Sequence, residues 1–110
     1  MLDVSVQKLI NTADDLLGNK EYKKSIGYYL KAMKLAKEDW NKGVKDELWQ
    51  KKVIFTACNG MGMAYANWGK SYDAIENFED AILFAPTEEA KQVAQRNLDK
   101  YKDTVKKKPA

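Results

Sequence analysis

The residue types that most often carry out catalysis are scarce in this sequence. It contains no histidine, the commonest general base and a frequent metal ligand. Its single cysteine, Cys58, is the one candidate nucleophile, but no partner base can be named for it. Cys58 also lies on an apolar helical stripe, where a cysteine usually packs as a small apolar residue. The sequence therefore predicts that Cys58 belongs to the core.

Pairs of adjacent acidic residues are the remaining candidates for proton-transfer chemistry. Neighbours in a helix point in different directions, so such pairs are poorly placed to share a proton. The chain also has no glycine-rich phosphate loop and no calcium-binding loop. We therefore expect no enzyme activity, no catalytic residue, no metal and no cofactor. Such pairs include Asp14–Asp15, Glu38–Asp39, Asp46–Glu47 and Glu88–Glu89.

A line of three side chains offers binding chemistry instead. Asn59, Met63 and Asn67 recur at four-residue spacing, so they share one face of a predicted helix. The two amides can donate and accept hydrogen bonds toward a peptide backbone, and the methionine offers an adaptable apolar contact. The alternative interpretation is that all three are ordinary solvated surface residues.

Five predicted helices position these side chains. Apolar residues at three-and-four spacing predict helices over about 3–17, 21–36, 47–68, 71–84 and 87–106, and the second continues through Trp40 if nothing stops it. Asp46, Ser71 and Thr87 are predicted N-caps, and Gly69 is a predicted C-terminal residue. Glycine and proline are few and no alternating strand pattern is present, so the fold class is all-α.

The stretch from Cys58 to Pro86 resembles the tetratricopeptide repeat. It reads Cys58-x2-Met61-Gly62-x2-Tyr65, then Gly69, Ala74-x3-Phe78, Ala81 and Pro86. The family signature is W-x2-L-G-x2-Y, then A-x3-F, then P, on a period of about 34 residues. The first large aromatic residue is the only part missing. Apart from the family, Gly62, Ala74 and Ala81 predict two antiparallel helices that cross closely, which is the simpler alternative.

A weaker upstream copy reads Leu9-x2-Thr12-Ala13-x2-Leu16, then Ser25-x3-Tyr29 and Ala32, with Lys37 in place of the closing proline. Ala13 and Gly62 are 49 residues apart, 15 more than the usual period, and the excess falls in residues 38–52. We expect these additional residues to form extra turns on the second and third helices, so that the two helices make one long hairpin. Near its tip we expect Trp40, Val44, Leu48 and Trp49, either packed on one another or forming an exposed docking patch.

The resemblance implies a single domain over residues 1–110, with repeats at about 3–40 and 53–86 and a capping helix at 87–107, wound as a right-handed α-α superhelix. In this family the first helix of each repeat lines a concave groove that binds a protein or peptide. The implied groove residues here are Gln7, Ile10, Asp14, Leu17, Thr56, Asn59, Met63, Ala66 and Asn67.

Some family members bind the C-terminal carboxylates of chaperones with a clamp of lysine, asparagine and arginine. Ile10, Asp14 and Gly60 stand at clamp positions in this sequence, so we do not expect that ligand. Asp14 instead favours a ligand with some basic character.

The charge distribution argues against a nucleic-acid partner. The net charge is +3, and residues 98–110 account for it with five lysines and two aspartates, which leaves the rest of the chain neutral. Arginine is almost absent, and no aromatic residues interleave with the lysines. No signal peptide and no membrane-length apolar run is apparent, and one cysteine allows no intramolecular disulfide, so we expect a cytoplasmic protein.

The sequence as a whole predicts a protein-interaction scaffold or adaptor that binds a peptide or helix of its partner in the groove. The alternative is a structural, self-associating protein, a homodimer through the Trp40/Trp49 tip or the open N-terminal face. A three-helix trafficking module is a more distant alternative, which the strong second copy disfavours.

Overall fold

Five α-helices make up the described part of the chain. The computed structural model describes residues 2–43 and 46–107, with the side chains of 2–4, 40 and 105–107 excepted. The helices are α1 (Leu2–Gly18), α2 (Tyr22–Asn41), α3 (Glu47–Trp68), α4 (Ser71–Leu83) and α5 (Glu88–Lys107). Each end lies within one residue of its predicted position, with α2 following the longer of its two alternatives.

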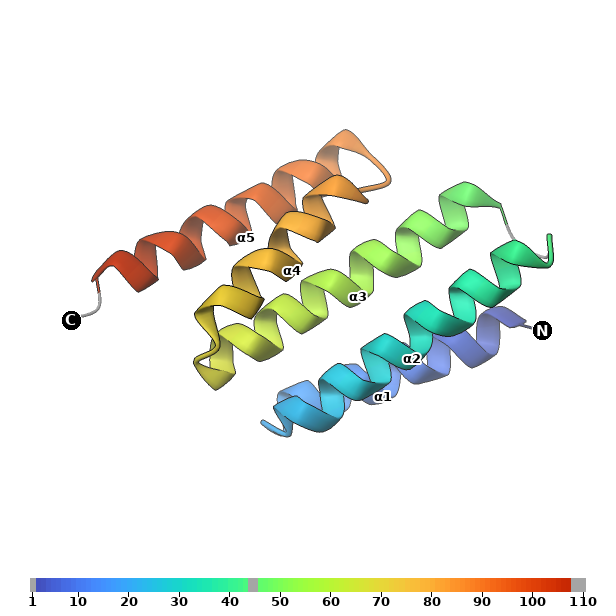
Figure 1. Cartoon of the computed structure of the whole chain (residues 1–110), viewed down its shortest axis with the longest axis horizontal. Helices are drawn as coiled ribbons and strands as arrows, with labels where there is room; N and C mark the ends of the chain where they lie inside the picture. The colour runs from blue at the N-terminus through green and yellow to red at the C-terminus, as the bar shows by residue number, and fades with distance from the viewer. Residues whose placement is uncertain (1, 44–45, 108–110) are drawn as a thin grey trace.

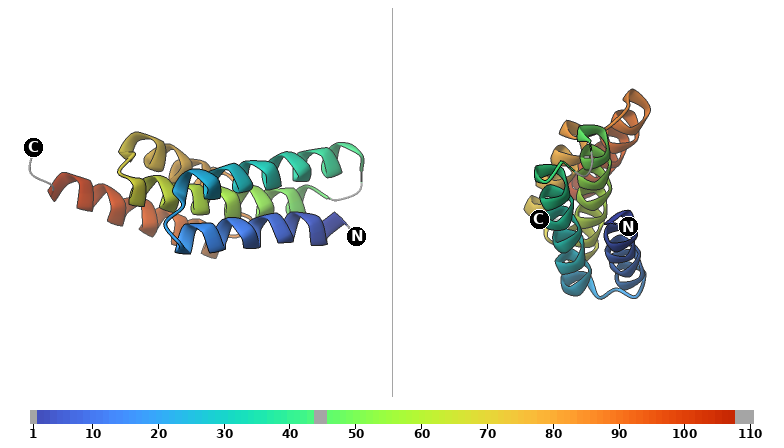
Figure 2. Two further views of the ribbon diagram at one scale, coloured as in Figure 1. Left: turned by 90° about the horizontal axis from the view of Figure 1, so that it is seen from below. Right: turned by 90° about the vertical axis from the view of Figure 1, so that its right-hand side faces the viewer.

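The helices pack mainly against their neighbours in sequence, as antiparallel pairs. Contacts join α1 to α2, α2 to α3, α3 to α4 and α4 to α5, and α1 also touches α3. Figure 1 shows α3 between α2 and α4. Figure 1 and Figure 2 together show the α1–α2 pair on one side of α3 and the α4–α5 pair on the other side. The molecule is flat and elongated, with extents of 49 × 30 × 17 Å.

Three of the four predicted helix ends are confirmed. The Asp46 side chain accepts a hydrogen bond from the Trp49 N–H at 2.8 Å, and Thr87 Oγ1 accepts one from the Ala90 N–H at 3.1 Å. Such N-caps typically stabilise a helix by about 1 kcal/mol. Gly69 follows α3 in the left-handed conformation (φ 83°), which glycine adopts without a steric penalty.

The prediction for Ser71 is wrong. Ser71 is the first residue of α4 rather than its N-cap, and the N-cap residue Lys70 makes no side-chain capping bond. The Ser71 hydroxyl instead accepts a hydrogen bond from the Tyr101 hydroxyl at 3.1 Å. A contact with α5 therefore takes the place of the predicted local cap.

Gly62 allows α4 to approach α3, as the sequence predicts. A Cβ atom at Gly62 would lie 2.6 Å from the ring of Phe78, which is 3% exposed. No real Cβ sits that close to a neighbour, so any side chain here would displace the ring. Alanines complete the tight packing between helices, and Ala13, Ala32, Ala36, Ala57, Ala64, Ala74, Ala81 and Ala94 are all fully buried.

A second close contact, which no pattern in the sequence predicted, involves Gly60 and Tyr29. The Tyr29 ring lies where a Cβ of Gly60 would be, and Tyr29 is 1% exposed. Its hydroxyl donates a hydrogen bond to the Asp14 carboxylate. One turn earlier, Ser25 Oγ donates to the Ala13 carbonyl at 2.7 Å. These contacts tie α2 to α1 on one side and to α3 on the other.

Candidate functional site

Cys58 is a core residue in the structure. Its side chain is 2% exposed, and burial, with a smaller effect of the Asp80 charge, raises the pKa of its thiol to about 12. A thiol that stays protonated at neutral pH is a poor nucleophile. Within the described residues, no three His, Cys, Asp or Glu side chains lie close enough together to hold a metal ion.

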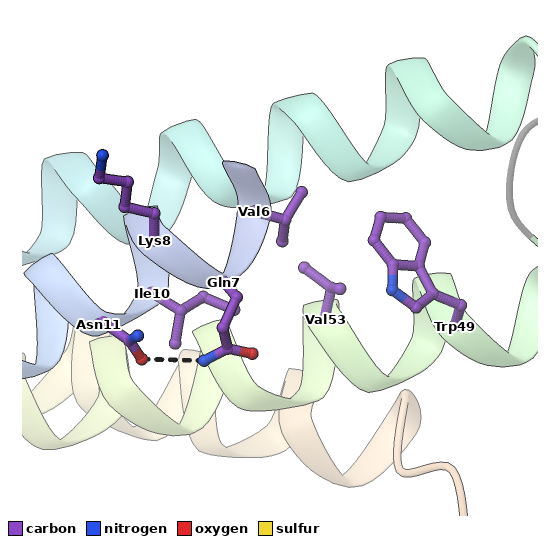
Figure 3. A pocket seen from close by; sticks show the side chains of 7 residues that line it. All are labelled: Val6, Gln7, Lys8, Ile10, Asn11, Trp49 and Val53. Carbon is purple, nitrogen blue, oxygen red and sulfur yellow. Dashed lines mark hydrogen bonds between the residues drawn. The ribbon is translucent and has the colours of Figure 1, made fainter. Parts of the chain in front are cut away.

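One concave surface lies between α1 and α3, and we call it the α1–α3 hollow. Its volume is about 670 Å³, and its lining residues are Val6, Gln7, Lys8, Ile10, Asn11, Trp49 and Val53. The almost fully buried Val6, Ile10 and Val53 form an apolar floor. Figure 3 shows Trp49 at one end of this floor and Lys8 extending away from it.

A pair of amides borders the apolar floor. Gln7 Nε2 donates a hydrogen bond to Asn11 Oδ1 at 2.9 Å, one helical turn further along α1 (Figure 3). Both side chains are exposed, so the bond orients them without removing them from water. A ligand in this hollow would therefore meet apolar carbon on the floor and amide groups at the edge.

The second concave surface lies between α3 and α5, and we call it the α3–α5 hollow. It has a volume of about 320 Å³, and its lining residues are Met63, Ala66, Asn67, Phe78, Asn97, Lys100, Tyr101 and Thr104. Met63 is 49% exposed, which leaves half of a large apolar side chain available for contact. Lys100 is exposed and provides a positive charge on the α5 side.

The structure distributes the predicted groove residues over these two hollows. Gln7 and Ile10 line the α1–α3 hollow, although Ile10 is only 5% exposed and contributes mainly to its floor. Met63 and Asn67 line the α3–α5 hollow, together with Ala66. Thr56 is exposed on α3 but lines neither hollow.

Two predicted groove residues, Asn59 and Asp14, line neither hollow. Asn59 is half-buried, and its Oδ1 atom is buried without a hydrogen-bond partner among the described residues. A four-residue step turns about 40° on a helix, so Asn59 lies about 80° around α3 from Asn67. Asp14 is exposed and accepts the hydrogen bond from Tyr29. The predicted line of Asn59, Met63 and Asn67 is therefore a spiral whose first member points partly inward.

Trp49 is partly buried and packs against the main apolar core besides lining the α1–α3 hollow. The side chain of Trp40 and all of Val44 lie outside the described residues. Leu48 is 49% exposed beside the hairpin turn.

Helix α5 contributes to the site, although the sequence predicted only a capping role for it. Asn97, Tyr101 and Thr104 follow one another at four- and three-residue spacing, so they share one face of α5. That spacing was visible in the sequence. The packing of this face beside Met63 and Asn67 was not, because it depends on how α5 folds back over α4.

Comparisons of the chain with protein-family models, with curated proteins and with solved structures found no match. The molecule is a small all-helical protein of five sequentially packed helices. No helix in the described part of the chain is long and apolar enough to cross a membrane.

Proposed function

We propose that this protein is a non-enzymatic interaction module of the tetratricopeptide type, which binds a peptide or helix of a partner protein along α3. The observation that carries the proposal is that both hollows lie along α3, one between α3 and α1 and the other between α3 and α5. The sequence signature from Cys58 to Pro86 supports the family, and the close contact at Gly62 supports the packing that this signature requires. The superhelical arrangement of the repeats is part of the proposal.

The separation of the hollows sets the size of the ligand. Val53 in one hollow and Met63 in the other are ten residues apart on α3, which is about 15 Å along a helix. An extended segment covers that distance with about five residues, and a helical one with about ten. Each hollow offers an apolar contact, so the matching ligand carries two apolar side chains at this separation.

Selection of binding peptides tests the proposal directly. A phage-displayed random peptide library is panned against the full chain, and the selected peptides are then measured against a Met63→Glu/Asn67→Glu variant. Both positions are exposed, so the variant should stay folded, whereas a charge at the half-buried Asn59 would disturb the core. We expect affinity for the selected peptides to fall by about tenfold or more, because two charges would interrupt the apolar contact.

The control is Leu30→Glu/Asn41→Glu, which makes the same kinds of substitution at exposed positions on α2, away from both hollows. It should bind the peptides as the wild-type chain does. Enrichment of no peptide would argue against an interaction module. Equal binding to the wild-type chain and to the Met63/Asn67 variant would place the site elsewhere.

A further inference from the structure

Acidic and basic residues are concentrated on different helices of this chain. Within its bounds, α4 has four acidic residues and no basic one, whereas α2 has five lysines and two acidic residues. Figure 1 shows α3 between these two helices. In the described part of the chain, salt bridges join Lys24 to Glu21 and Lys51 to Glu47, so neither pairs an acid of α4 with a lysine.

The outer surface of α4 combines its acids with apolar side chains. Tyr72, Glu76, Glu79 and Leu83 follow one another at spacings of four, three and four residues, and we call this set the α4 stripe. Tyr72 is 82% exposed and Leu83 is 73% exposed. A hollow of about 490 Å³ lies along the stripe, lined by Tyr72, Ile75, Glu76 and Glu79.

The outer surface of α2 has the opposite charge around an apolar centre. Lys23, Leu30, Lys34 and Lys37 share one face, and we call this set the α2 stripe. Leu30 is 52% exposed and the three lysines are also exposed. The two stripes are similar in length, about 21 Å for residues 23–37 and about 17 Å for residues 72–83.

We propose that the α2 stripe of one molecule docks on the α4 stripe of a second copy of this chain. Leu30 enters the hollow beside Tyr72, and Lys34 and Lys37 approach Glu76 and Glu79. Because α3 separates the two stripes within one molecule, this pairing forms only between molecules. The occupant is a second copy because the two surfaces match each other in charge, in length and in the placing of a protruding leucine against a hollow.

The contact joins two different surfaces, so it does not close on itself as a symmetric dimer does. Each dimer leaves one α2 stripe and one α4 stripe unoccupied, and further copies add at both ends. The proposed surface is also distinct from the two hollows along α3, so self-association and peptide binding are separable.

Sedimentation velocity of the full chain at several concentrations provides the first test. In about 10 mM NaCl, where charges act over about 30 Å, we expect the weight-average mass to rise with concentration. In about 1 M NaCl, where they act over about 3 Å, we expect the monomer. A monomer at every concentration in low salt would overturn the proposal.

Charge exchange provides the second test. Lys34→Glu/Lys37→Glu and Glu76→Lys/Glu79→Lys should each lower the association constant by about tenfold or more, because like charges then face each other. An equimolar mixture of the two variants should associate again, since each supplies a surface that matches the other. A mixture that stays monomeric would contradict the proposed pairing of these stripes.

The matched control is Lys91→Glu/Lys102→Glu, which makes the same change in net charge at exposed positions of α5. It should retain the self-association of the wild-type chain. If it lost association to the same extent as Lys34→Glu/Lys37→Glu, the effect would come from net charge alone and the α2 stripe would have no specific role. Helical content by circular dichroism confirms that each variant is folded.

Discussion

Tyr29 joins three helices through two kinds of contact. Its ring lies against the backbone of α3 at Gly60, and its hydroxyl donates to Asp14 on α1. Burial, followed by the hydrogen bond to Asp14, raises the pKa of the Tyr29 hydroxyl far above its ordinary value, so it remains a donor across the physiological range. The sequence did not reveal this contact because Tyr29 and Gly60 are far apart in the chain and neither shows which residue the other meets.

Substitution of Gly60 by alanine should destabilise the protein. The new methyl group would overlap the Tyr29 ring, which is buried and held by its hydrogen bond. Overpacking of this kind typically costs about 1–3 kcal/mol. Gly27→Ala is the control, because nothing lies within 4 Å of its Cβ position and alanine is favoured over glycine in a helix by about 1 kcal/mol. Urea denaturation should give a higher free energy of unfolding for Gly27→Ala than for the wild-type chain, and a lower one for Gly60→Ala.

Burial of Cys58 makes the free energy of unfolding depend on pH in the alkaline range. The pKa of its thiol is raised from 9.0 to about 12, so the unfolded chain loses this proton first. The stability is therefore complete below pH 9 and decreases as the pH rises toward 12. One such group contributes a slope of up to about 1.4 kcal/mol per pH unit.

A Cys58→Ala variant should show a shallower loss of stability over this range. Urea denaturation at a series of pH values from 8 upward gives the slope of the free energy of unfolding against pH for the variant and for the wild-type chain. The buried tyrosine Tyr29 contributes equally to the slope of both proteins. Parallel slopes would show that the thiol titrates alike in the folded and unfolded chains.

At the scale of elements, α5 is attached to the molecule mainly through α4. Leu98 is 3% exposed and packs in a small core with Ala74 and Phe78. The ring centroids of Phe78 and Tyr101 lie 6.0 Å apart, and the Tyr101 hydroxyl bonds to Ser71. The same helix supplies half of the α3–α5 hollow, so its attachment also determines that part of the candidate site.

Truncation of Leu98 should therefore release α5. Leu98→Ala removes a nearly buried side chain and should lower the free energy of unfolding by about 2–5 kcal/mol. Val93→Ala, at a position of the same helix that is 44% exposed, should change it by less than about 0.5 kcal/mol. Chemical denaturation measures both. Similar values for the two variants would mean that α5 is not held by this core.

Helix existence and helix ends were predictable because they depend on local signals. Asp46, Gly69 and Thr87 end or begin helices through groups a few residues away, and the apolar spacing fixes the rest. Ser71 shows the limit, because its hydroxyl is used by Tyr101 from another helix. The two halves of the candidate site were likewise beyond local reasoning, since the share of α5 and the inward turn of Asn59 depend on tertiary packing.

At the scale of the whole molecule, α3 is the central helix. It packs against α2 and α4 and also touches α1, whereas α5 packs mainly against α4. The main apolar core contains nine residues of α3, of which six are buried and three are partly buried. Unequal packing of this kind produces unequal local stability, because opening a helix costs the contacts that it makes.

Amide hydrogen exchange should reveal this order. We expect the central turns of α3 to exchange most slowly and α5 to exchange before them, because α5 can separate without disturbing the contacts of α1 and α2. Exchange measured by mass spectrometry on peptides from each helix would give the exchange rates of α3 and α5 separately. Equal protection of α5 and α3 would show that the molecule opens as one cooperative unit.

The position of α3 also has a mechanical consequence. The α1–α2 pair and the α4–α5 pair are connected mostly through this one helix, so a rotation of one pair against the other about α3 would leave the contacts within each pair intact. That rotation would change the widths of the two hollows together. A segment long enough to reach both would act as a strut across the molecule, and its length would set the angle between the pairs.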